Sequence, residues 1–450
     1  MRIAAVQRIG LPIVAAILWV IAATPAHAIP AFARKYGLPC SACHEAWPKL
    51  SNFGQVFRDN GYQLGNDRDA PIYQQPSYWP IMFRIPVEWH RENSNRVPLD
   101  TIPGDPTGGI SERPLTTAGF DISGLDIFTA GTLYKNISFG LQPIVDTAGK
   151  IHIQTAFVRF DNLLHSPWLN FKFGKFELDT LISEKRMLTL NNTDGFYYNY
   201  HFRPPSDSNT FGGIGDPQLG IELMGHSKNS YTRYSVAMLS SNDGQSGLPT
   251  NKTYDFYGDF TQGFEIKGLG LQRIGAYAYI GKSPTYFQTS GGTPVAGAGS
   301  GNRSFYRAGA YGLWYLGKFD FATFYMHGAD NVFLGTSTPA NDPSALPVGA
   351  KGPTWNGGFV EAHYTYNPQL ILVARYELVR MDRVTRFDKL RSFGSLDAWT
   401  IGYRWYPIMS SRAGLAWVQE YSRGRFIGTA PLTGRDENSS SYLMGFDFDF

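Results

Sequence analysis

The chain has 450 residues and a formal net charge of +3 at pH 7; charged residues make up only 17% of it, aromatic residues reach 15%, and there are 49 glycines. This balance fits neither a disordered chain nor a helix-rich enzyme. No run of five like charges occurs, so bulk electrostatics does not select a partner and no nucleic acid is expected to bind.

Residues 1–28 have the features of a secretory signal peptide. Arg2 and Arg8 precede an apolar run over 9–23, and residues 26–28 form an Ala-His-Ala cleavage pattern. After this segment no apolar run reaches the roughly 18 residues that a membrane-spanning helix needs, which excludes an inner-membrane helical bundle. A closed barrel is still allowed, because each of its strands needs only about 9 to 11 residues.

Residues 29–75 form a separate short segment that carries both cysteines of the chain. Leu50, Phe53 and Phe57 recur at a helical spacing, and Gly61 stands at the expected end of that helix. Polar residues without periodicity follow up to Pro80 and indicate a linker. We therefore divide the mature chain into a segment at 29–75 and a larger domain at 76–450.

The motif Cys40-Ser41-Ala42-Cys43-His44 is the sharpest chemical signal in the sequence. The C-x-x-C-H spacing lets two thiols form thioethers to the vinyl groups of a haem while the adjacent imidazole binds the iron. A zinc site needs four ligands, a thioredoxin-like dithiol needs a βαβ context, and a disulfide leaves His44 unexplained. We predict one haem c, attached through Cys40 and Cys43, with His44 as the proximal ligand of the iron.

The distal ligand of that iron is left open between two side chains. Met82 and His90 both lie on the polar face of the first predicted strand, so either side chain points inward. A methionine ligand would raise the reduction potential and a histidine would lower it.

The haem segment is too short to bury a core of its own, so we expect it to pack against the larger domain as a plug. Four aromatic side chains of the segment either contact the macrocycle or pack on one another: Phe32, Trp47, Phe53 and Phe57.

From Ile81 onward the hydrophobic period changes to two. In residues 81–90 the apolar face carries Ile81, Phe83, Ile85, Val87 and Trp89, and the other face carries Met82, Arg84, Glu88 and His90. The same alternation recurs at 370–378 and at 442–450. Apolar residues outward and polar residues inward are typical of a transmembrane barrel. A secreted sandwich or propeller is the alternative, but it would rarely place aromatic side chains opposite charged ones so regularly.

The fold class predicted is all-β, a transmembrane antiparallel β-barrel of about 16 strands preceded by the short α-helical haem c segment. The predicted strands are 81–90, 117–129, 133–145, 151–161, 169–177, 217–226, 230–240, 253–265, 270–281, 303–316, 318–328, 356–367, 369–381, 396–406, 411–422 and 440–450.

Connections between these strands alternate in length. Tight turns are expected at Gly131, Ser227-Lys228-Asn229, Gly317 and Asn367-Pro368, and long polar loops at 91–116, 178–216, 241–252, 282–302, 329–355, 382–395 and 423–439. Outer-membrane barrels place short turns on the periplasmic side and long loops outside. We therefore expect the N-terminal segment and Phe450 on the periplasmic side.

The N-terminal motifs resemble a known family, the fused outer-membrane monohaem cytochrome–porins, best known as the iron-oxidising cytochromes of iron bacteria. The residues that carry the resemblance are Pro30-x-Phe32-Ala33-Arg34-x-x-Gly37-x-x-Cys40-x-x-Cys43-His44 and Pro48-x-Leu50-x-x-x-Gly54-x-x-Phe57-x-x-x-Gly61-Tyr62. The terminal Phe450, after alternating aromatics, is also similar to the last-strand signal of Gram-negative outer-membrane proteins. The expected location is thus the outer membrane, with the lipid bilayer as a partner.

The resemblance implies electron transfer across the outer membrane through the haem. An extracellular donor such as Fe(II) would supply the electron, and a periplasmic electron-carrier cytochrome would remove it. Protein side chains would then do no acid–base chemistry. Two alternatives stay open: a porin whose haem segment is a structural or redox-sensitive plug, and electron export from the cell to extracellular acceptors.

Overall fold

The structure of the protein is a computed structural model. It describes residues 31–46, 49–65, 69, 71, 74, 80–105, 107–122, 124–180, 214–215, 217–240, 254–284, 287–290, 293–296, 302–329, 354–383, 395–410, 413–428 and 433–449. The predicted signal peptide, Trp47, Phe450 and most of the predicted long loops lie outside these residues.

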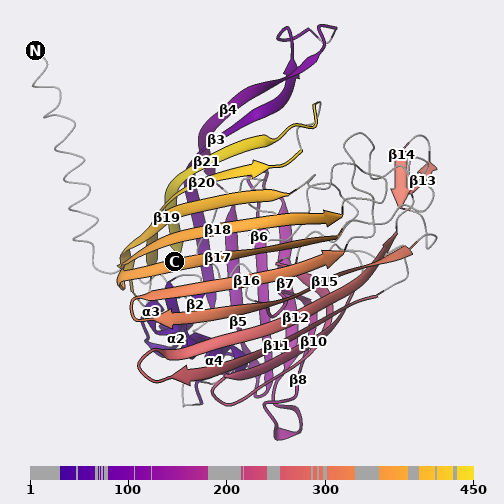
Figure 1. Cartoon of the computed structure of the whole chain (residues 1–450). Coiled ribbons are helices and arrows are strands. Elements are labelled where there is room, and N and C mark those ends of the chain that lie inside the picture. Colours follow the sequence, from indigo (N-terminus) through magenta and orange to yellow (C-terminus); the bar gives the residue numbers. More distant parts are fainter. Residues whose placement is uncertain are drawn as a thin grey trace, which may run out of the picture.

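The larger domain is a closed antiparallel barrel (Figure 1). Its strands are β3 (Ile81–Asp100), β4 (Ile110–Ile122), β5 (Leu125–Tyr134), β6 (Ile137–Val145), β7 (Ile151–Phe160), β8 (Asn170–Phe176), β9 (Gln218–His226), β10 (Thr232–Ser240), β11 (Tyr254–Ile266), β12 (Gly270–Pro284), β15 (Asn302–Leu316), β16 (Phe319–Ala329), β17 (Thr354–Asn367), β18 (Leu370–Arg383), β19 (Leu396–Met409), β20 (Gly414–Phe426) and β21 (Glu437–Asp449). Closure pairs β21 with β3 and β9 with β10.

Strands β4 and β5 are two halves of one wall strand. Both pair with β3 in the antiparallel sense, β4 opposite its upper part and β5 opposite Ile81 to Arg84. The break falls at Gly124, whose φ of 129° and whose contact with Val145 O, 2.5 Å from where a Cβ would stand, both require glycine. With β4 and β5 taken as one strand, the described wall has sixteen strands, as predicted.

Two predicted connections are wrong. Residues 91–116 are mostly a hairpin, because β3 continues to Asp100 and β4 begins at Ile110. This hairpin rises beyond the rim of the barrel (Figure 1), and β4 is exposed along nearly its whole length. Since neither of its faces is buried, the sequence there has no reason to alternate. The turn predicted at Gly131 is instead inside β5, and the chain turns at Lys135, where φ is 29°.

The other three predicted tight turns are confirmed. Ser227-Lys228-Asn229 joins β9 to β10, Gly317 joins β15 to β16 with a φ of 63°, and Asn367-Pro368 joins β17 to β18. A small separate hairpin, β13 (Phe287–Ser290) with β14 (Thr293–Ala296), lies at the opposite end of the barrel from these turns (Figure 1).

The outward face of the barrel is apolar and the inward face is mixed. On β11 and β12 the outward side chains Phe256, Phe260, Ile274 and Ile280 are exposed, while the inward positions are buried. A closed antiparallel barrel satisfies every backbone polar group of its wall, and an apolar outer face suits it to lipid. The predicted all-β barrel is confirmed.

The N-terminal segment is small and lies at the short-turn end of the barrel (Figure 1). It contains α2 (Ala31–Tyr36), α3 (Cys40–Cys43), β1 (His44–Ala46), β2 (Lys49–Leu50) and α4 (Asn52–Asp59). Its side chains contact residues beside the turns: Cys40 donates to Ser410 after β19, and Gln63 donates to Thr132 near the end of β5. The segment is therefore positioned by the barrel.

Candidate functional site

The Cys40–His44 motif forms one turn of helix that passes directly into extended chain. Cys40 opens α3, and His44 closes it with extended backbone angles. Neither cysteine is in a disulfide, and both are partly exposed. The Cys40 Sγ donates a hydrogen bond of 3.1 Å to the carbonyl of Ser410, in the turn between β19 and β20. The motif is thus held against one side of the barrel wall.

Both thiols of the motif are neutral near pH 7. Burial, with a smaller contribution from the Asp449 carboxylate, raises the pKa of the Cys40 thiol to about 11. Burial alone raises the pKa of the Cys43 thiol to about 11. Thiols of this kind do not behave as nucleophilic or redox-active cysteines, whose pKa values are lowered instead.

Helix α4 is fixed directly against the motif. The Ser51 side chain caps the helix by accepting from the backbone N–H of Gly54 at 3.2 Å, and it donates to the carbonyl of Ala42 at 3.1 Å. A Cβ on Gly54 would stand only 2.1 Å from the carbonyl oxygen of Cys43. The close approach of α3 and α4 therefore requires glycine at position 54. The predicted end of this helix is confirmed, since Gly61 follows the C-cap residue with a φ of 75°.

The motif opens onto a large apolar cavity inside the barrel, with about 1610 Å³ of space not filled by atoms, its mouth included. Cys40, Cys43 and His44 all line it. Its apolar walls come from the segment and from β3, β5, β7, β8, β19 and β20; they include Phe32, Phe57, Met82, Phe128, Phe157, Phe176, Ile408, Met409 and Leu415. A cavity of this size and polarity is a site for a large apolar ligand.

Of the two predicted distal ligands, one lies in this cavity. Met82 is buried and lines it, whereas His90 does not. His90 also faces the lumen, with Nε2 3.7 Å from the Glu88 carboxylate. Eight residues of strand separate the two side chains, roughly 27 Å at the usual rise, so they cannot serve the same site. A second thioether, Met409 at the end of β19, also lines the cavity and was missed by the sequence analysis.

The four aromatic side chains singled out in the segment do not all lie at the cavity. Phe32 and Phe57 line the cavity and also pack on each other, edge to face with ring centroids 4.9 Å apart. Tyr62 stacks on Phe32 at 5.1 Å. Phe53 is 45% exposed and does not line the cavity, and Trp47 lies outside the described residues. Packing on one another is therefore confirmed for Phe32 and Phe57, and contact of their rings with a macrocycle stays a prediction.

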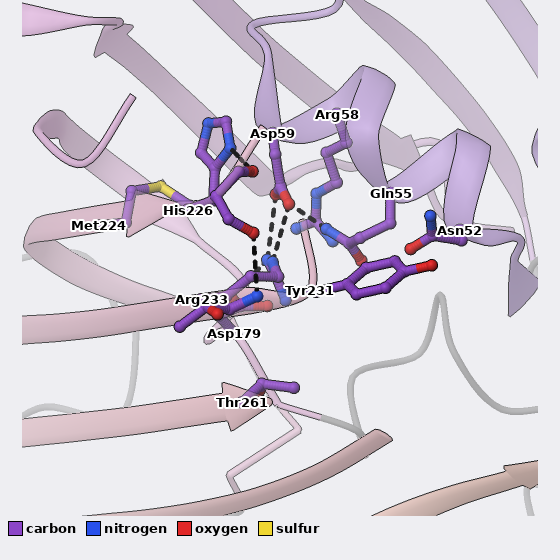
Figure 2. Close-up of polar contacts among 12 residues, drawn as sticks. Asn52, Gln55, Arg58, Asp59, Asp179, Met224, His226, Tyr231, Arg233 and Thr261 are labelled. Atoms are coloured by element: carbon purple, nitrogen blue, oxygen red, sulfur yellow. Dashed lines mark hydrogen bonds and ion pairs between the residues drawn. The ribbon is translucent and has the colours of Figure 1, made fainter. Parts of the chain in front are cut away.

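Buried ion pairs tie α4 to the barrel wall. Asp59 accepts two hydrogen bonds from the Arg233 guanidinium, at 2.8 and 3.1 Å, and Arg233 also pairs with Asp179 at 2.5 Å (Figure 2). Burial opposes ionisation of Asp59, but the charges of Arg233 and His226 together with the hydrogen bonds from Arg233 outweigh it, and the pKa of that carboxyl lies below its ordinary value. On β7, Arg159 donates to the carbonyl of Arg58 at 2.9 Å. These contacts fix the end of α4.

A second set of buried contacts holds the segment to β15, β16 and β17. Lys49 pairs with Glu45 at 2.7 Å and with Asp320 on β16. Asp320 also contacts the ring of His363, 2.6 Å from Nδ1. Tyr315 donates to Glu45 at 2.7 Å. The segment is therefore attached on two sides of the lumen.

Within the described residues, no group of three or more His, Cys, Asp or Glu side chains could hold a metal ion by itself. No helix in the described part of the chain is long and apolar enough to cross a membrane.

No protein-family model matches the chain, and no curated protein matches it either. Solved structures do. An anion-selective porin from Comamonas acidovorans is 10% identical, with a TM-score of 0.48, over 82% of this chain and 99% of that one. The outer-membrane channel DcaP of Acinetobacter baumannii is 12% identical, with a TM-score of 0.47, over 81% and 96%. A loop-deletion form of OmpT from Vibrio cholerae is 11% identical, with a TM-score of 0.45, over 82% and 99%. At such identities the likeness concerns the fold alone.

Proposed function

We propose that this protein is a haem c-bearing outer-membrane barrel that transfers electrons across the outer membrane. The observation that carries the proposal is the meeting of Cys40, Cys43 and His44 with a large apolar cavity inside the barrel. Two thiols and an imidazole at the wall of such a cavity fit a covalently bound haem, which supplies reversible one-electron chemistry when bound. No other described side chains combine these groups with a cavity of this kind.

Different residues of the site would attach the haem, bind its iron and exclude water from it. Cys40 and Cys43 would attach it, and His44 would bind its iron from the side of α3. Phe32, Phe57 and the apolar wall would exclude water, which together with the axial ligands sets the reduction potential. The contacts of α4 with the barrel would keep the segment in place.

Met82 is the favoured distal ligand, with Met409 as its competitor, because both thioethers line the cavity and His90 does not. Far-red absorption of the oxidised protein tests this choice, since a methionine bound to ferric haem gives a weak charge-transfer band there. We expect Met82→Leu to abolish the band and Met409→Leu to leave it. The converse result would assign Met409, and a wild-type protein without the band would exclude a thioether ligand.

The cavity lies at the short-turn end of the barrel, the periplasmic end in outer-membrane proteins. An electron carrier in the periplasm, such as a soluble cytochrome, is therefore the partner nearest to the site. The opposite partner would be extracellular, with Fe(II) as the donor that the resemblance of the N-terminal motifs suggests. Electron export to an extracellular acceptor is the reverse direction, and a strongly negative midpoint potential would favour it.

The decisive experiment is a pyridine haemochrome assay and a redox titration on protein purified in detergent from cells that mature c-type cytochromes. We expect one haem per chain, covalently retained after acid–acetone extraction. The matched control is the double variant Cys40→Ala with Cys43→Ala, which removes both thioethers and should lose covalent retention. A colourless wild-type protein would exclude the proposed function.

A second candidate is a channel in which the same segment serves as a plug, and the sixteen-strand barrel with its porin-like fold favours it. Planar bilayer recordings distinguish the two functions. A large ion current in protein whose reduced haem is not reoxidised by external acceptors would support the channel. A closed lumen with rapid haem reoxidation would support electron transfer.

A further inference from the structure

One end of the apolar cavity is cationic. Arg58 of α4 and Lys172 of β8 line it, and the single carboxylate among the lining residues at that end is Glu177, which follows β8. Lys172 is buried, pairs with Glu222 and lies 4.8 Å from the centroid of the Phe176 ring. The remaining walls are almost entirely apolar, so the two cations mark a distinct polar end.

Arg58 has capacity to bind a further acceptor. Its Nη1 is buried and makes no hydrogen bond in the structure. Its backbone is fixed, because its carbonyl accepts from Arg159, and the next residue, Asp59, is held by Arg233 (Figure 2). A buried guanidinium nitrogen without an acceptor is costly, and a carboxylate is the acceptor that a guanidinium fits best. A carboxylate entering the cavity would therefore find Arg58 in place.

The cationic end is on a different side of the barrel from the cysteines. Cys40 contacts the turn between β19 and β20, whereas Lys172 is on β8. Along the closed wall, β21, β3, the β4–β5 strand, β6 and β7 stand between β20 and β8. A ligand attached at Cys40 and Cys43 that fills the cavity thus extends from one side of the lumen toward the other, and its far edge meets Arg58 and Lys172.

We propose that Arg58, with Lys172 beside it, binds the carboxylate edge of the group attached at Cys40 and Cys43. This inference rests on the proposed function. The chemistry of haem matches the arrangement, because its two propionates leave the macrocycle on the edge opposite the vinyl groups that form the thioethers. Arg58 would then be a positioning residue, which orients the group and keeps a carboxylate ionised beside it.

Two consequences follow for the reduction potential. A cation near the iron stabilises the reduced, less positive form, so its removal lowers the midpoint potential. A carboxylate paired with Arg58 stays ionised near neutral pH, whereas one released in a buried site titrates closer to neutrality. The midpoint potential of the wild type is therefore insensitive to pH, and that of Arg58→Gln falls with rising pH.

The test measures midpoint potentials of the full-length protein in detergent from about pH 5 to about pH 8, where such a released carboxyl titrates. Arg58→Gln should have a lower potential with a new pH dependence, and Arg58→Lys, which keeps the charge, should restore most of both. Glu177 is the competing partner of Arg58, so Glu177→Gln is combined with Arg58→Gln. The pH dependence persists in the double variant if the carboxylate belongs to the bound group.

Loss of the pH dependence in the double variant would assign Arg58 to Glu177 and overturn the proposal. An unchanged potential and pH profile in a haem-retaining Arg58→Gln would overturn it as well. If Arg58→Gln does not retain haem, Arg58→Lys is titrated instead. Lysine keeps the charge but not the paired geometry of the guanidinium, so a small lowering of the potential with a residual pH dependence is expected, and a profile identical to that of the wild type would overturn the proposal. A wild-type protein without haem would instead refute the proposed function itself, so the two failures are distinguishable.

Discussion

The barrel and the N-terminal segment solve the problem of stability in opposite ways. In the barrel, each described strand apart from β4 pairs with two neighbours, so nearly all of the backbone is satisfied within the wall. The segment has two very short strands, and its longest helix, α4, has eight residues. Helices of that length are not stable alone. The chemically interesting part of the molecule is thus the part that depends on the rest for its structure.

The segment depends for its structure on the contacts that it makes with the barrel. They are mostly buried ion pairs and hydrogen bonds, such as Arg233 with Asp59 and Lys49 with Asp320. Such pairs add little net stability but are strongly unfavourable when one partner is removed. Weakening the contacts between the segment and the barrel should therefore release the segment while the barrel stays closed. Three substitutions and a change of pH test this expectation.

The largest effect is expected from Arg233→Ala. Asp59 and Asp179 would then be left buried without their cation, which typically costs about 3 to 5 kcal/mol. Limited proteolysis in detergent should cleave the segment rapidly, while the barrel keeps its heat-modifiable migration on gels. The control is Arg425→Ala, which removes an exposed ion pair with Asp436 worth about 1 kcal/mol or less. Equal cleavage in both variants would contradict the prediction.

The second largest effect is expected from acid, which should release the segment from the barrel. The Arg233 cation, assisted by His226 and opposed by burial and by Asp179, keeps the pKa of Asp59 below its ordinary value. A lowered pKa in the folded state contributes stability above the pKa of the unfolded chain, near 3.9, and that contribution is lost as the pH falls through the folded value. Cleavage of the segment should therefore accelerate below about pH 4. In Asp59→Asn, the acceleration should be much weaker.

Gly54→Ala should have a smaller but specific effect. The added Cβ meets the backbone of Cys43 at 2.1 Å, so α3 and α4 must separate, and overpacking of this kind costs about 1 to 3 kcal/mol. Gly119→Ala on β4 is the matched control, since nothing lies within 4 Å of its Cβ position. We expect altered haem absorption and faster proteolysis of the segment in the first variant only. Equal behaviour would show that α3 can move freely.

The smallest expected effect is that of Ser51→Ala. The hydroxyl caps α4 and also donates to Ala42, so its loss should cost about 1 kcal/mol. Thermal denaturation followed by the Soret band measures it, since the barrel does not contribute to that signal. Ser51→Thr keeps the hydroxyl and should restore most of the stability; failure of this rescue would argue against the cap.

The sequence predicts the barrel better than it predicts the parts whose side chains do not alternate between lipid and lumen. In a strand with one face in lipid and the other in the lumen, apolar and polar residues alternate along the sequence. This pattern at 81–90 and 370–378 predicts which side chains point inward, and the prediction is correct for Met82. The hairpin of β3 and β4 has no buried face and no alternation, so the sequence of residues 91–116 predicts a loop where the structure has two strands. Gly131 lies inside β5, so glycine alone does not mark a turn there.

The candidate site was predictable only in its local sequence motif. The C-x-x-C-H spacing is local, so Cys40, Cys43 and His44 could be singled out from sequence. Met409, Arg58 and Lys172 enter the site through the closure of the barrel, which brings β8 and β19 to one cavity. Lys172 occupies an inward position of a predicted strand, but nothing in a single sequence says which inward residues of distant strands meet.

The glycine break between β4 and β5 has a consequence for the surface of the molecule. Above Gly124 the ladder of β4 runs along β3, and within the described residues no register joins its other side to a strand. A free strand border of this length is a template for unwanted association between chains. Pro114 has no N–H to donate, and Arg113 and Asp121 place charges along the strand. Proline and charged residues are the usual means by which proteins keep such a border from recruiting a neighbour.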